Sequence, residues 1–246
     1  MFDIDINEKL LNIVENKHVA LIGPAPYLID SNRGKEFDNA DIIARPNEII
    51  PPTNMRKDYG SRTDLFFCNF GTTWMPGIKR KISLDDHDDY FKKIKLVIGS
   101  AIKAHPSEGN FLSWSDNHVS EIPNNFQSIN EHNLPFYWIG VKDYKKIYEN
   151  VKVEFNTGVA AMVILLQYPI KSLKISGFTF YKGGNTYEKL YYKGHMDEID
   201  ISGRSFGFSS GHGYHANTKQ IAFVNKLIQQ HKEKVIIDTE LEQVLQ

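Results

Sequence analysis

Residues 18–46 read HVALIGPAPYLIDSNRGKEFDNADIIARP, and the order of elements in this stretch decides the fold. The first five residues are an apolar run ending at Gly23-Pro24, which predicts a strand that enters a tight loop. Residues 32–38 are expected to be a short helical segment. Residues 41–44 are expected to form a second strand, closed by Pro46. A strand, a helix and another strand in this order are typical of a parallel sheet.

The same alternation continues on both sides of this stretch. We expect helices at residues 6–16, 85–93, 157–168 and 215–231. Further strands are expected at residues 64–68, 95–99, 135–139, 173–176 and 234–237. The sequence therefore predicts an α/β fold: a single Rossmann-like domain over residues 1–246, with a mostly parallel central sheet and helices on both faces.

Two long polar segments interrupt the pattern. Residues 104–133 carry scattered Pro, Gly and Asn, and we interpret them as an excursion over the active-site face. Residues 182–213 are rich in Gly, Tyr and Ser, and we expect a loop or lid there. Both segments are candidates for binding an acceptor molecule.

The composition excludes several classes of protein. The chain has 246 residues, of which 41% are hydrophobic, so it can bury a full core. Its 29 basic and 30 acidic residues nearly cancel, which gives no support for nucleic acid or an anionic membrane as partner. Cys68 is the only cysteine, which excludes an internal disulfide. The N-terminal residues show no long apolar run, so we expect a cytoplasmic protein without a signal peptide or transmembrane segment.

Loops at the carboxyl ends of the strands are the candidate sites, because parallel sheets bind ligands there. The loop after Ile22 has neither the G-x-G-x-x-G fingerprint nor a Walker lysine. Its small residues, Gly23 and Ala25, would still let the backbone approach a phosphate or a base. A simple turn between two elements is the alternative.

Polar residues follow the second strand. The amide of Asn47 can donate to a phosphate oxygen and accept from a ribose hydroxyl, although Asn is also a common turn residue. Arg45 can bind a carboxylate or phosphate, or form a structural salt bridge.

Two helix starts are candidates for chemistry. Thr157-Gly158 opens an apolar helix, whose free N–H groups and partial positive charge suit an anion; Thr157 can also be a plain N-cap. His215 precedes the last long helix, where the helix dipole favours the neutral imidazole that a general base needs.

An acidic cluster offers a rival interpretation. Asp86-His87-Asp88 fits the Asp-x-Asp pair with which many glycosyltransferases hold a metal and a nucleotide sugar. These acids also lie where a helix is expected to begin, and there they would stabilise the dipole and face water.

Taken in order, the motifs resemble the sialyltransferases of glycosyltransferase family 29. Residues 18–47 and 59–67 are similar to the long motif of that family, and residues 155–180 to its short motif, a Thr-Gly that opens an apolar helix and a final Gly-Phe. The closing His-x4-Glu motif corresponds to His215 through Gln220.

The chain departs from the family at several positions. Pro24 stands where the family usually has an Asn that contacts the donor. Leu190-Tyr191-Tyr192-Lys193 resembles the family's His-Tyr-Tyr-acid segment without its His. His195, a few residues further on, is a candidate substitute for that His, and Gln220 stands where the family has the closing Glu. The membrane anchor and disulfide of the animal enzymes are missing, which is typical of a bacterial or viral member.

The resemblance implies a GT-A-like variant of the fold and a metal-independent, inverting glycosyl transfer. The co-substrate would be CMP-activated sialic acid, a related nonulosonic acid or Kdo, with no cofactor, and the acceptor a glycan or glycolipid. His215 would be the general base, and Tyr191, Tyr192 or His195 would hydrogen-bond the leaving phosphate. The remaining donor contacts implied are Gly23, Ala25, Asn47, Asn69, Thr157, Gly158, Gly177 and Phe178.

Two other functions stay open from the sequence. One is a metal-dependent transferase that uses a UDP- or GDP-sugar through Asp86 and Asp88. The other is a non-catalytic module that binds a nucleotide or a glycan.

Overall fold

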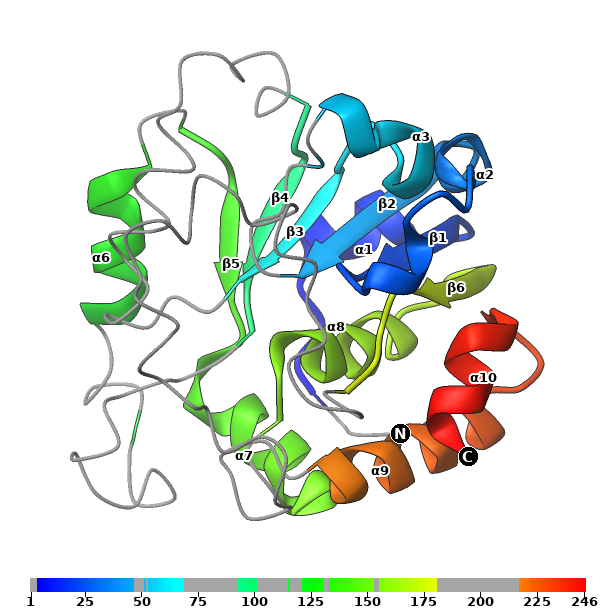
Figure 1. Cartoon of the computed structure of the whole chain (residues 1–246). Helices are drawn as coiled ribbons and strands as arrows, with labels where there is room; N and C mark the ends of the chain where they lie inside the picture. Colours follow the sequence, from blue (N-terminus) through cyan, green and yellow to red (C-terminus); the bar gives the residue numbers. More distant parts are fainter. Residues whose placement is uncertain are drawn as a thin grey trace, which may run out of the picture.

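The computed structural model describes residues 4–46, 51, 53–68, 93–100, 115, 121–130, 133–152, 155–180 and 217–246. Within these ranges, seven strands form one sheet in the order β5-β4-β3-β2-β1-β6-β7, and every neighbouring pair is parallel (Figure 1). The strands are β1 (His18–Ile22), β2 (Ile42–Pro46), β3 (Leu65–Cys68), β4 (Leu96–Gly99), β5 (Phe136–Trp138), β6 (Ser172–Ser176) and β7 (Val235–Ile237). The predicted parallel α/β fold is confirmed.

Helices cover both faces of the sheet, and the alternation of side chains along β1 shows how. Val19 and Leu21 point into one core, which they share with α1 (Glu8–Val14), α8 (Thr157–Leu166) and α9 (Asn217–Gln230). Ala20 and Ile22 point into a second core on the opposite face. That core is closed by the short helices η1 (Pro26–Leu28), α2 (Gly34–Asp38), η2 (Thr53–Met55) and α3 (Arg56–Tyr59).

Helix α8 fills the middle of the first core. All ten of its residues are buried, as expected for a helix that is apolar on every side. Figure 1 shows α8 below the central strands, with α7 (Gly140–Val151) and α9 beyond it. The helix therefore has little freedom to shift, and its amino end is a fixed point of the fold.

The order in which the chain adds strands to the sheet reverses at β1 and β6. From β1 the chain builds outward through β2, β3 and β4 to β5, and then returns to add β6 and β7 on the other side of β1. β1 and β6 are paired over their whole length, from His18 with Ser172 to Ile22 with Ser176. Their following loops thus leave the sheet at the same level, which makes a topological switch point.

The predicted elements match those of the structure with differences at several places. The strands fall within two residues of their predicted bounds. Among the described residues, the short helices η1, η2 and α3 were not predicted. Three longer helices were not predicted either: α7, α10 (Thr239–Leu245) and α6 (Glu121–Ile129), which lies inside the segment interpreted as an excursion. The predicted helix at 85–93 lies outside the described residues except for its last residue, Lys93, and the predicted lid at 182–213 lies wholly outside them.

Candidate functional site

The loops after β1 and β6 touch through their backbones. The N–H of Gly23 donates to the carbonyl of Ser176 at 2.8 Å, and the N–H of Ala25 donates to the carbonyl of Gly177 at 3.0 Å. A Cβ on Gly23 would lie 2.2 Å from the carbonyl oxygen of Gly177, and Gly177 itself has a φ of 80°. Glycine at both positions is what permits this close approach.

The amino end of α8 lies beside these loops. A Cβ on Gly158 would lie 2.5 Å from the ring of Phe178, so that ring rests directly on the first turn of the helix. The N-cap is Asn156, whose side-chain oxygen accepts from the N–H of Val159 at 2.8 Å. The prediction that Thr157 caps the helix is therefore wrong. Thr157 is already helical, while Asn156 has the extended backbone from which a short amide reaches the third N–H.

Asn156 is fixed in turn by Gln220 of α9. The N–H of Asn156 donates to the side-chain oxygen of Gln220 at 3.1 Å, and Gln220 is fully buried. The sequence comparison singled out Gln220 because it replaces a Glu of the resembled family. In this chain the amide oxygen of Gln220 accepts the backbone N–H without burying a charge.

A pocket opens where these pieces meet, at the carboxyl ends of β1, β2 and β6. Its walls are small or aromatic, and the N-cap of α8 contributes a polar side chain. The lining residues are Pro24, Ala25, Pro46, Asn156, Gly158, Gly177, Phe178, Thr179 and Phe180. The first N–H groups of a helix have no intrahelical partner, so this end of α8 offers donors and a partial positive charge to a bound anion.

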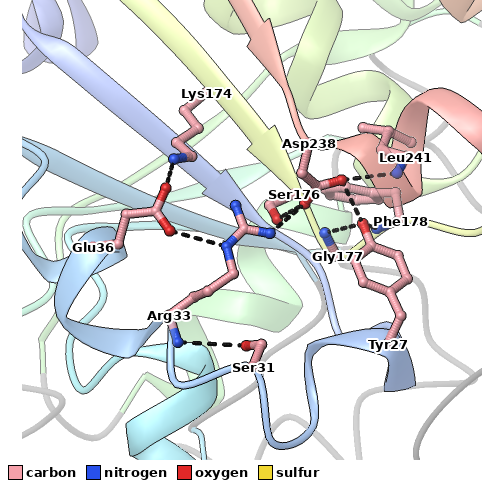
Figure 2. A network of polar contacts seen from close by, with 10 residues as sticks. All are labelled: Tyr27, Ser31, Arg33, Glu36, Lys174, Ser176, Gly177, Phe178, Asp238 and Leu241. Carbon is pink, nitrogen blue, oxygen red and sulfur yellow. Dashed lines mark hydrogen bonds and ion pairs between the residues drawn. The ribbon is translucent and has the colours of Figure 1, made fainter.

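A tyrosine that the sequence did not single out supports one wall of the pocket (Figure 2). The hydroxyl of Tyr27 accepts from the N–H of Gly177 at 2.6 Å and from that of Phe178 at 3.2 Å. It donates to Asp238 at 3.3 Å. Burial, with the negative charge of Asp238, raises the pKa of Tyr27 well above its usual value. The phenol therefore stays protonated and keeps its donor.

The structure brings together most of the predicted site residues that it describes. Ala25, Gly158, Gly177 and Phe178 line the pocket, and Gly23 contacts Gly177 beside it. Thr157 is 8% exposed and adjoins the pocket through its neighbours. The other predicted positions lie outside the described residues: Asn47, Asn69, Asp86, Asp88, Tyr191, Tyr192, His195 and His215.

Arg45 has a structural role, which its contacts in the described part of the chain show. It is fully buried, and its guanidinium donates to the backbone carbonyls of Tyr59 at 2.5 Å and Arg62 at 3.3 Å. Its two described partners are therefore carbonyl oxygens, where the sequence suggested a carboxylate or a phosphate. The contacts fix the segment that follows α3.

The residues that the structure describes include no cluster of three His, Cys, Asp or Glu side chains arranged to hold a metal ion. Among the same residues, no helix is long and apolar enough to cross a membrane.

The fold and its pocket define a doubly wound parallel α/β protein with its candidate site at the switch point. No family model and no curated protein sequence matches the chain. Solved structures do match. The α-2,3-sialyltransferase Cst-I of Campylobacter jejuni is 17% identical, with a TM-score of 0.54 over 89% of this chain and 75% of Cst-I.

Two further solved structures match at similarly low sequence identity. The sialyltransferase CstII of Campylobacter jejuni, solved with the substrate analogue CMP-3FNeuAc, is 17% identical, with a TM-score of 0.50 over 90% of this chain and 81% of CstII. A mammalian sialyltransferase is 13% identical, with a TM-score of 0.50 over 94% of this chain and 76% of its own. At these identities the likeness establishes a shared fold.

Proposed function

We propose that the chain is a sialyltransferase-like glycosyltransferase whose donor is a CMP-activated sialic acid, a related nonulosonic acid or Kdo. The pocket at the switch between β1 and β6 carries this proposal. It joins the glycine-containing loops after β1 and β6 to the amino end of a buried helix, whose first N–H groups suit a nucleotide phosphate. The sialyltransferase fold of the matching structures and the order of the sequence motifs support the same choice. Membership of family 29 stays a prediction.

The proposed reaction is a metal-independent, inverting displacement. An acceptor hydroxyl attacks the anomeric carbon of the sugar, the bond from that carbon to the phosphate oxygen breaks, and CMP leaves with the electron pair. His215 takes the hydroxyl proton, and Tyr191, Tyr192 or His195 hydrogen-bonds the leaving phosphate. Oriented donors can stabilise such an anion in place of a metal. The acceptor is a glycan or glycolipid.

Calorimetric titration with CMP, CDP, UMP, UDP and GDP tests the nucleotide choice, with Mn²⁺ in one series and a chelator in the other. We expect selective binding of CMP in both series. Preference for UDP or GDP that requires Mn²⁺ would refute the proposal and favour the Asp86/Asp88 site. CMP binding without release of CMP from any CMP-sugar, including slow hydrolysis, would indicate a non-catalytic module.

The role of His215 has its own test. We expect His215→Ala to lower turnover by roughly 10²–10⁴-fold, the usual loss for a general base, and to leave CMP affinity nearly unchanged. Near-normal turnover in this variant would exclude His215 from the role.

A further inference from the structure

The hydroxyl of Tyr27 has all of its hydrogen-bonding positions filled. A phenol offers one donor and two acceptor positions. Here the donor is directed to Asp238, and the acceptor positions receive the backbone N–H groups of Gly177 and Phe178, at 2.6 and 3.2 Å (Figure 2). Two successive backbone groups of the pocket wall therefore depend on one side-chain oxygen.

Asp238 keeps this hydroxyl in place. One carboxylate oxygen accepts from the hydroxyl of Tyr27 and from the N–H of Leu241. Through the second of these bonds Asp238 is the N-cap of α10. The other carboxylate oxygen accepts from the hydroxyl of Ser176 and, at 2.9 Å, from the guanidinium of Arg33. The Asp238 side chain is only 5% exposed. Four donors, from three parts of the chain, thus fix its orientation, and with it the position of the Tyr27 oxygen.

The two residues held by Tyr27 shape the pocket. Gly177 has a left-handed backbone, and its carbonyl accepts from the N–H of Ala25 in the loop after β1. The ring of Phe178 rests on Gly158 in the first turn of α8. A shift of this pair would move a wall and the ring that covers part of the helix end, where the proposed phosphate site lies.

We propose that Tyr27, held by Asp238, is a positioning residue for the pocket: it fixes the Gly177-Phe178 segment and so sets the affinity for the nucleotide. The affinity part of this inference rests on the proposed function. Because the pKa of Tyr27 is raised by burial and by the Asp238 charge, the phenol remains neutral and the arrangement persists through the neutral pH range.

The test compares Tyr27→Phe with Tyr168→Phe. Tyr168 is also a buried tyrosine whose hydroxyl accepts a backbone N–H, that of Asn7 at 3.0 Å, but it follows the opposite end of α8. Amide hydrogen exchange is measured at Gly177 and Phe178, and CMP affinity by calorimetry. In Tyr27→Phe we expect exchange at these two amides and the Kd for CMP each to rise about tenfold or more, because two N–H groups lose their acceptor. In Tyr168→Phe both should stay within about twofold of the wild type.

The outcomes separate the two proposals. Unchanged exchange at Gly177 and Phe178 in Tyr27→Phe would overturn the positioning role, and so would faster exchange with unchanged CMP affinity. If Tyr27→Phe does not fold, Asp238→Ala replaces it. This variant removes the oxygen that accepts from Tyr27 together with the cap of α10, and Asn7→Ala, which loses the cap of α1, is its control. Unchanged exchange and affinity in Asp238→Ala would overturn the inference. If the wild type binds no CMP, the proposed function fails, and the exchange rates alone decide whether Tyr27 holds the wall.

Discussion

Replacement of Gly23 by Ala tests whether the backbone contact between the β1 and β6 loops is as tight as the structure has it. The new Cβ would lie 2.2 Å from the Gly177 carbonyl oxygen and 2.9 Å from its carbon. A tolerable contact needs about 3.0 Å, so the loops must separate by roughly 0.8 Å. No side-chain rotation can relieve this contact, because the position of a Cβ is fixed by its own backbone and the carbonyl of Gly177 belongs to the backbone.

The energetic cost has two parts. Overpacking of this kind costs about 1–3 kcal/mol. Separation of the loops also stretches the bond from the Ala25 N–H to the Gly177 carbonyl, now 3.0 Å long. A buried hydrogen bond left unmade costs about 1–3 kcal/mol. We therefore expect Gly23→Ala to lower the free energy of unfolding by about 2–6 kcal/mol.

Urea denaturation at neutral pH measures this change, with Gly158→Ala as the matched control. In that control the new Cβ meets the Phe178 ring at 2.5 Å, and a shift of this side chain can relieve the contact, whereas a backbone carbonyl cannot give way so easily. We expect its unfolding free energy to stay within about 1 kcal/mol of the wild type. A loss below about 0.5 kcal/mol in Gly23→Ala would refute the reasoning, since the two loops would then not be in fixed contact.

Two further predictions concern the cap of α8 and the buried tyrosines. Asn156→Ala and Asn7→Ala each remove an N-cap, from α8 and α1, and should each cost about 1 kcal/mol in urea denaturation. Only Asn156→Ala should also weaken CMP binding; equal affinities in calorimetry would contradict a phosphate site at α8. Burial raises the pKa of Tyr137 above the unfolded value of about 10, so the unfolded state loses its proton first as pH rises. The free energy of unfolding should be constant below about pH 10 and fall above it, and this fall should be less steep in Tyr137→Phe than in the wild type. Identical urea midpoints of both proteins from pH 9 to 11 would show that Tyr137 is not involved.

The sheet was predictable because each strand is a short apolar run that can be recognised in the sequence. HVALI and LFFC are short apolar runs bounded by polar or turn residues, and burial of both faces makes such runs continuous. Helix α7 was missed although Val141, Tyr144, Ile147 and Val151 have helical spacing and are buried. The many polar residues between these four positions made the helical pattern easy to overlook. Helix α10 also had a signal, since Asp238 precedes Thr-Glu-Leu-Glu in the pattern of an N-cap followed by acids.

The site was only partly predictable. Gly23, Gly158 and Gly177 follow strands or open a helix, so rules about strand ends and helix starts are enough to single them out. Tyr27 and Asp238 could not be found in this way. They are 211 residues apart, and neither has a neighbouring pattern that indicates a ligand. Only the return of the chain to add β6 and β7 beside β1 brings them together.

The same return explains why the carboxyl-terminal part of the chain controls the pocket without lining it. Gln220 of α9 holds the N–H of Asn156, and Asn156 caps α8 at one wall. Asp238, between β7 and α10, holds Tyr27, and Tyr27 holds the Gly177-Phe178 segment at another. Every pocket residue precedes both of these supports in the chain. The pocket can therefore reach its final shape only after β7 and α10 have packed onto the sheet, so a substitution in these last elements is expected to affect ligand affinity as well as stability.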